Sequence, residues 1–83
     1  MLRTISIAVP TTATTIEDLI EDFRWVAGII LQSPTDNSAT IYFGDSTTPM
    51  FLPVGESISL PVNSTRNLYV KGTSGDSIIV ALV

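Results

Sequence analysis

Apolar and polar residues alternate along several short segments of this chain, and turn residues separate these segments at nearly even intervals. Ile5, Ile7 and Val9 alternate with small or polar residues over about residues 3–9, and the alternation returns in residues 56–62 and 67–71. A period of two is typical of a β-strand with one buried face. We therefore predict a strand in each segment, the first ending at Pro10, which has no backbone N–H to donate.

Two further segments, residues 25–31 and 77–83, are almost continuously apolar, as in strands that are covered on both faces. A dense turn signal at residues 34–38 follows the first of them, so residues 25–43 are predicted to form a hairpin. Pro49 and Pro53 bracket a short segment that fits an edge strand. This rhythm predicts an all-β fold of six to eight strands, a small antiparallel β-sandwich or jelly-roll-like barrel, as a single domain over residues 1–83.

The period changes once along the chain. Ile16, Leu19, Ile20 and Phe23 are spaced as one apolar stripe of a short helix, with acidic residues between them. Thr15 stands where an N-cap residue would be, and acidic side chains in the first turn of a helix are stabilised by the helix dipole. The alternative is an extended loop whose apolar residues cover one end of the sandwich, because so short a helix needs packing to persist.

The composition favours association with other subunits. The chain has 83 residues, no cysteine, 45% hydrophobic residues and only 14% charged residues. A domain of this size without disulfides has a small core, and its C-terminal strand is apolar on both sides. We predict a homo-oligomer, most simply a trimer. Its predicted contact residues are Trp25, Ile79, Val80, Ala81, Leu82 and Val83.

The charge excludes some classes of partner. The formal net charge is −4, with four basic residues in all. Binding to nucleic acid through its phosphates requires a basic patch, which this composition does not offer. No apolar run approaches the ~18 residues of a membrane helix, and residues 1–15 are too polar for a secretory signal. We expect a protein that is made and assembled in the cytoplasm, without nucleic acid or membrane as a partner.

The sequence offers no set of catalytic residues. Gly-Asp-Ser occurs at residues 44–46 and 75–77 and resembles the nucleophile block of some esterases, but the chain contains no histidine to activate Ser46 or Ser77. Asp36, Asp45 and Asp76 are possible oxygen ligands for Ca²⁺, yet their spacing is not that of a calcium loop and Asp beside Gly is ordinary turn chemistry. We predict no enzymatic activity, no metal and no cofactor.

Three aromatic residues leave one alternative open. Trp25, Tyr42 and Tyr69 could form a platform on which sugar rings stack, although large aromatic residues in small β-domains more often belong to the core or to an interface. A receptor- or glycan-binding module is therefore the second interpretation.

Residues 25–83 carry a resemblance to a known class of proteins. A strand ending in Tyr42-Phe43-Gly44-Asp45 leads to the turn Pro53-Val54-Gly55-Glu56-Ser57 and then to the strand Asn67-Leu68-Tyr69-Val70. This arrangement resembles small accessory virion proteins of tailed bacteriophages. The resemblance implies a β-sandwich that decorates or cements a capsid, or forms part of a head or tail fibre. It also implies the major capsid protein or another virion protein as partner, and the virion as location.

Overall fold

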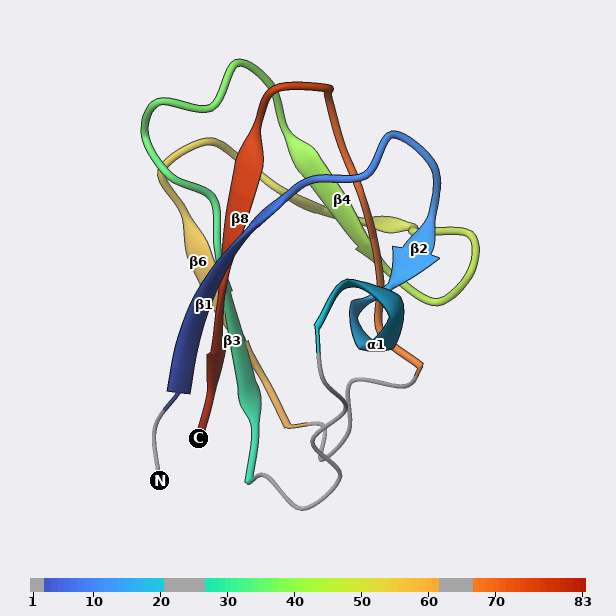
Figure 1. Ribbon diagram of the computed structural model, residues 1–83, viewed down its shortest axis with the longest axis vertical. Helices are drawn as coiled ribbons and strands as arrows, with labels where there is room; N and C mark the ends of the chain where they lie inside the picture. Colours follow the sequence, from blue (N-terminus) through green and yellow to red (C-terminus); the bar gives the residue numbers. More distant parts are fainter. Residues whose placement is uncertain (1–2, 21–26, 62–66) are drawn as a thin grey trace.

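A computed structural model describes residues 3–20, 27–61 and 67–83, which form eight β-strands and one short helix. The all-β prediction is confirmed (Figure 1). The elements in chain order are β1 (Arg3–Ala8), β2 (Thr14–Thr15), α1 (Ile16–Leu19), β3 (Ile29–Gln32), β4 (Ile41–Gly44), β5 (Met50–Leu52), β6 (Ser57–Leu60), β7 (Tyr69–Lys71) and β8 (Ser77–Leu82).

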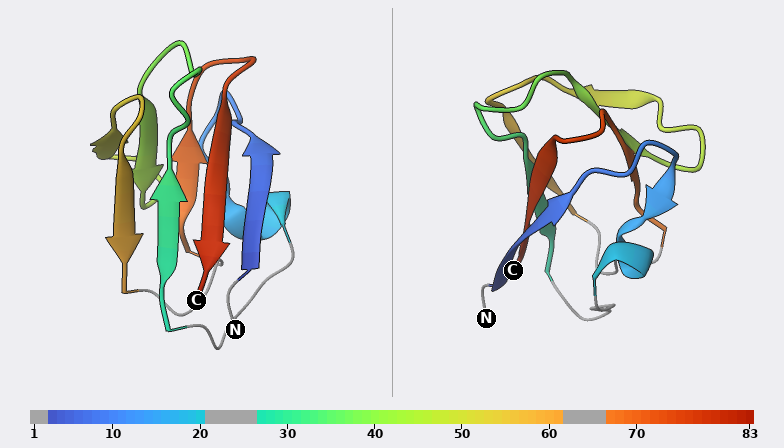
Figure 2. Two further views of the ribbon diagram at one scale, coloured as in Figure 1. Left: turned by 90° about the vertical axis from the view of Figure 1, so that its left-hand side faces the viewer. Right: turned by 45° about the horizontal axis from the view of Figure 1, so that its top comes forward.

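The strands form two four-stranded antiparallel sheets. Sheet A has the order β1-β8-β3-β6 and sheet B the order β2-β7-β4-β5. Figure 2 (left) views sheet A face on, with sheet B behind it. The outer strands are β1 and β6 in one sheet and β2 and β5 in the other, so the predicted edge position of Met50–Leu52 is confirmed.

The predicted hairpin over residues 25–43 is wrong. β3 belongs to sheet A and β4 to sheet B, so the connection between them crosses from one sheet to the other. The turn signal in residues 34–38 is real, but the loop is held by the start of β8. The Ser38 and Ala39 amides donate to the Asp76 carboxylate, at 2.8 and 3.1 Å. Turn residues show where a chain bends and do not show which strand it then pairs with.

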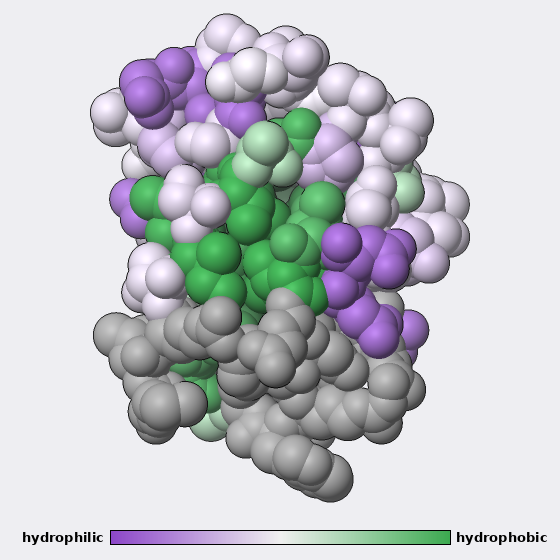
Figure 3. Space-filling view, viewed as in Figure 1, coloured by the Kyte–Doolittle hydropathy of each residue, from purple (hydrophilic) through white to green (hydrophobic). Residues whose placement is uncertain are grey.

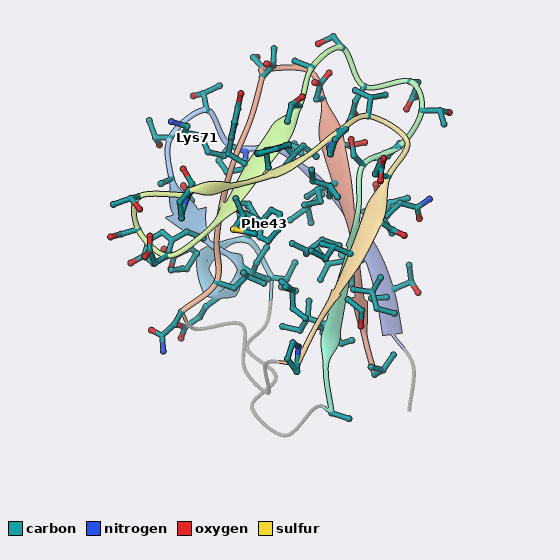
Figure 4. All side chains as sticks on the ribbon, turned by 180° about the vertical axis from the view of Figure 1, so that it is seen from behind. Phe43 and Lys71 are labelled. Carbon is teal, nitrogen blue, oxygen red and sulfur yellow. The ribbon has the colours of Figure 1, made fainter. Side chains whose placement is uncertain are left out.

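The core lies between the sheets and is filled mainly by alternate residues of β3, β4, β7 and β8, and the half-buried Ile7, Ile58 and Leu60 pack against it. Phe43 lies between the two sheets, whereas Lys71 lies at the periphery (Figure 4). The buried hydrophobic residues are Val9, Ile16, Ile29, Leu31, Ile41, Phe43, Leu52, Leu68, Val70, Ile78, Val80 and Leu82.

The predicted helix is short. Thr15 caps it as expected, its hydroxyl accepting from the Asp18 amide (3.3 Å), but Ile20 is already extended. Phe23 and Trp25 lie outside the described residues. The polar segment before the helix ends in β2, a two-residue strand that the sequence pattern does not reveal. β2 pairs with β7, and the Ile16 amide then donates to the Leu68 carbonyl (2.8 Å), which fixes the fully buried Ile16 in the core.

Candidate binding surfaces

The predicted interface strand, β8, lies in the middle of sheet A between β1 and β3. Val80 and Leu82 face the core and are at most 2% exposed, so they offer no surface to a partner. Ile79 and Ala81 point to the outer face and are half-buried, and Val83 is exposed. The oligomer prediction therefore depends on Ile79, Ala81 and Val83.

The outer face of sheet A is neutral around these residues. Ile79 stands between Ser6 of β1 and Gln32 of β3, and Ala81 stands between Thr4 and Ile30. The outward residues of β6, Ser57 and Ser59, are also uncharged. Because these outward positions carry no charge, two copies of this face can approach each other without like-charge repulsion.

The most exposed apolar residues lie elsewhere, on β4, β5 and the turn that follows. Phe51 is 66% exposed, Met50 51%, Tyr42 43% and Val54 38%. We call Tyr42 and Phe51, which share the outer face of sheet B, the β4–β5 strip; Met50 is opposite the buried Phe43 and therefore lies on the other face of β5. Tyr42 and Phe51 are directly opposite each other in the pairing of the two strands, a relationship that brings Cβ atoms to about 4.5–5.5 Å. Large apolar side chains gathered in this way mark a site of interaction.

The strip continues into a polar border on β7. Lys71 is opposite Tyr42 on the other side of β4, so Phe51, Tyr42 and Lys71 form one row across three strands on the outer face of sheet B. Tyr69, half-buried, is opposite Gly44 and diagonal to Tyr42. The structure thus brings together two of the three predicted stacking residues, Tyr42 and Tyr69. Sequence reasoning missed Phe51, although the exposed side of a proline-bracketed edge strand was a signal for it.

The aspartates singled out in the sequence hold loops. The Asp45 carboxylate accepts from the Thr47 hydroxyl and amide (2.9 Å for the amide), and these bonds lower the pKa of Asp45. The amide of Ser38 is the main cause of a lowered pKa at Asp76, opposed in part by burial. Both Gly-Asp-Ser segments are therefore turns. Ser46 is exposed, and the Ser77 amide donates to the Asn37 side chain (2.9 Å).

Polar side chains contribute little to the buried interior in the part of the chain that the structure describes. Three polar residues of connecting segments, Ser33, Thr48 and Asp76, are buried, and no buried side-chain nitrogen or oxygen of the described residues lacks a hydrogen-bond partner. No group of three or more acidic, histidine or cysteine residues stands together within residues 3–20, 27–61 and 67–83. The inward positions of β3, β4, β7 and β8 are aliphatic or, at Phe43, aromatic. No described helix is long and apolar enough to cross a membrane.

Comparison with solved structures identifies the fold. The chain is similar over 99% of its length to a de novo designed double-stranded β-helix, with a TM-score of 0.53, 12% identity and 95% of that chain covered. It is also similar to protein NMB1881 from Neisseria meningitidis, with a TM-score of 0.56, 10% identity and 71% of that chain covered. The fold is a small double-stranded β-helix.

A third similar structure, described as FeII HppE, gives a TM-score of 0.56 at 19% identity, and the present chain spans 42% of it. Identities this low establish the fold alone. A facial ferrous-iron site uses two imidazole groups and a carboxylate, and the present chain has no histidine. No protein-family profile and no curated protein matches the chain.

Proposed function

We propose that the chain is a non-catalytic structural subunit that attaches to a larger protein assembly through the β4–β5 strip. The observation that carries this proposal is the pair Tyr42 and Phe51, two exposed aromatic residues side by side on neighbouring strands. Burying a large apolar side chain contributes about 1.5–3 kcal/mol, from which the cost of association is subtracted. With two such residues, we expect each copy of the chain to bind the assembly weakly.

The proposed assembly is the virion of a tailed bacteriophage, where the chain acts as a capsid decoration or cement protein. This step is supported by the resemblance of residues 25–83 to accessory virion proteins. Weak contacts suit this role, because an oligomer that binds several equivalent sites at once gains from multivalency. The major capsid protein is the proposed partner, and assembly takes place in the host cytoplasm.

Mass spectrometry of purified particles tests the proposal. We expect the chain in the particles, and we expect purified protein to rebind stripped particles. Phe51→Ser should weaken rebinding about tenfold or more, which is 1.4 kcal/mol, while Thr73→Ala, an exposed change on another loop, should not. Absence of the chain from particles contradicts the virion role, and equal rebinding of both variants contradicts the role of the strip.

A glycan-binding module is the second candidate, favoured by the row of Phe51, Tyr42 and Lys71 with Tyr69 beside it. Aromatic rings on one flat face stack on sugar rings, and Lys71 would favour an acidic sugar. A glycan array separates the two functions. Saccharide binding that Tyr42→Ala abolishes, with rebinding to particles unaffected by Phe51→Ser, favours the glycan module.

A further inference from the structure

The edge of β1 that faces away from β8, far from the β4–β5 strip, presents backbone groups that have no backbone partner among residues 3–20, 27–61 and 67–83. Of the described strands, β1 pairs with β8 alone, and the Val9 amide continues this pairing by donating to the Asp76 carbonyl (3.1 Å). Successive N–H groups of a strand point to opposite sides. The N–H and C=O groups of Thr4, Ser6 and Ala8 therefore point away from β8. They make no backbone hydrogen bond outside the strand ladders within the described residues.

This edge lacks the usual protection. Outer strands are commonly kept from pairing by proline, by charged side chains or by being short. β5 has three residues between two prolines, β2 has two residues, and β6 has four and is followed by Pro61. β1 has six residues; it begins at Arg3 and Pro10 follows two residues after its end, but residues 4–8 contain neither proline nor charge.

An apolar surface lies beside this edge on its inner side. Ile5 and Ile7 are only half-buried, and Ile7, Leu19 and Ile20 pack against the rim of the core. Figure 3 shows apolar residues gathered between β1 and α1 on this face of the molecule. We call Ile5, Ile7, Leu19 and Ile20 together with the free edge the β1 shelf. It combines a hydrogen-bonding edge with an apolar floor.

We propose that the β1 shelf binds an extended segment of a partner protein, which adds to sheet A as a fifth, antiparallel strand. Main-chain hydrogen bonds to Thr4, Ser6 and Ala8 supply affinity, and alternate apolar side chains of the segment cover the floor. α1 lies behind β1 and reaches past its free edge (Figure 2, left). A second copy paired antiparallel through the same edge would carry its own α1 on the same side of the joined sheet, next to this one, whereas an added peptide strand carries no such helix.

The charge of the shelf defines the segment further. Asp18 is exposed on α1, Arg3 stands at the first position of β1, and the chain as a whole carries a net charge of −4. Basic residues flanking the segment are therefore favoured by charge complementarity. The outward side chains of Thr4, Ser6 and Ala8 are small and uncharged, so the outward side of the segment needs only small polar residues. The partner is an extended basic segment with apolar residues at every second position.

A short peptide of alternating Val and Thr, flanked by Lys, is the probe. Its Val side chains fix the register by facing the floor, so the Thr residues have the N–H groups that face β1. We expect binding to protect the Thr4, Ser6 and Ala8 amides from hydrogen exchange, whereas the Ile5 and Ile7 amides are slow already in the free protein. N-methylation of the Thr residues should weaken binding about tenfold or more, and N-methylation of the Val residues should not.

A variant of the protein completes the test. Ser6→Pro removes an N–H that faces the free edge and leaves the ladder with β8 intact, a position where an outer strand tolerates proline. We expect the variant to keep the wild-type circular dichroism spectrum and to lose peptide binding, while Ser6→Thr binds normally. Equal binding of the two methylated peptides overturns the inference. So does a dimer of the protein alone that Ser6→Pro dissociates, since the edge then belongs to a second copy.

Discussion

The side-chain amide of Asn37 pairs with the backbone of Ser77 as another strand residue would. Its Nδ2 donates to the Ser77 carbonyl (2.7 Å) and its Oδ1 accepts from the Ser77 amide (2.9 Å). In the register of β3 with β8, the residue opposite Ser77 would be Pro34, which has no N–H. Asn37 thus supplies the donor that Pro34 lacks, and it joins the β3–β4 connection to the start of β8.

We predict that Asn37→Ala destabilises the domain by about 1–3 kcal/mol, because it leaves two partly buried backbone groups of Ser77 without partners. Urea unfolding followed by circular dichroism measures the change. Thr35→Ala, an exposed substitution in the same loop, should stay within about 0.5 kcal/mol of wild type. Equal stability of the two variants would show that water replaces the Asn37 amide without loss.

The lowered pKa of Asp76 predicts that the stability of the domain depends on pH. The Ser38 amide holds the pKa of the folded carboxylate below its ordinary value, which is about 3.9 in an unfolded chain. The folded state therefore binds protons less readily than the unfolded state. The stabilisation is fully present above pH ~4 and is lost as the pH falls through the folded pKa.

Urea midpoints measured between neutral and strongly acidic pH test this dependence. Asp76→Asn should be less stable at neutral pH and should lose less stability on acidification than wild type. Asp36→Asn is the matched control, since it removes one carboxylate of the neighbouring loop without removing these hydrogen bonds. If Asp76→Asn and wild type lose the same stability on acidification, Asp76 is not the source of the dependence.

Local patterns predicted most of the strands but not their partners. Alternation placed β1, β6 and β7 because one face of each is buried, and Pro49 and Pro53 placed β5 at an edge. The hairpin prediction was wrong because pairing of β3 with β8 depends on residues 40 or more apart in sequence, such as Asn37 and Ser77. β2 has two residues and so shows no period.

The candidate surfaces were predicted only in part. The apolar run of residues 78–83 suggested an interface, but a central strand of a sheet between two neighbours is apolar on both faces for packing as well. Tyr42 was noticed as an aromatic residue, whereas its pairing with Phe51 required the register of β4 with β5. Exposure of a given side chain follows from strand order, which the pattern of apolar residues does not contain.

The close approach of Gly72 to Val9 predicts that the stability effects of substitutions at these two positions are coupled. A β-carbon on Gly72 would overlap Cγ1 of Val9, and the Gly72 amide donates to the Pro10 carbonyl (2.8 Å), so the two segments cannot separate freely. We expect Gly72→Ala to cost about 1–3 kcal/mol by overpacking. Val9→Ala removes the overlapping atom, so the double variant should cost less than the sum of the single ones, by about 0.5 kcal/mol or more.

Gly75→Ala is the control for this coupling. Gly75 has a φ of +92° with nothing within 4 Å of an added β-carbon, so its cost is backbone strain of about 1–2 kcal/mol. That cost should add to the cost of Val9→Ala. Urea unfolding of the five variants gives both sums, and additivity in the Gly72 pair would contradict the overlap.

The two faces of β8 predict opposite results for neighbouring substitutions. Val80 is fully buried in the core, so Val80→Asp places a carboxylate without a partner between the sheets. Its cost, about several kcal/mol, is comparable with the whole stability of a small domain, and the variant should be unfolded by circular dichroism. Ile79 is half-buried on the neutral outer face of sheet A, so Ile79→Asp should remain folded.

Analytical ultracentrifugation then tests whether this face joins copies of the protein. We expect wild type to sediment as an oligomer, a trimer in the simplest case. Ile79→Asp should sediment as a folded monomer, because the new carboxylate would be buried between subunits without a hydrogen-bond or ion-pair partner. Ile79→Thr keeps the β-branched shape without charge and should remain largely associated. An Ile79→Asp variant that keeps the wild-type mass would exclude the outer face of sheet A as the contact and would move any association to another surface.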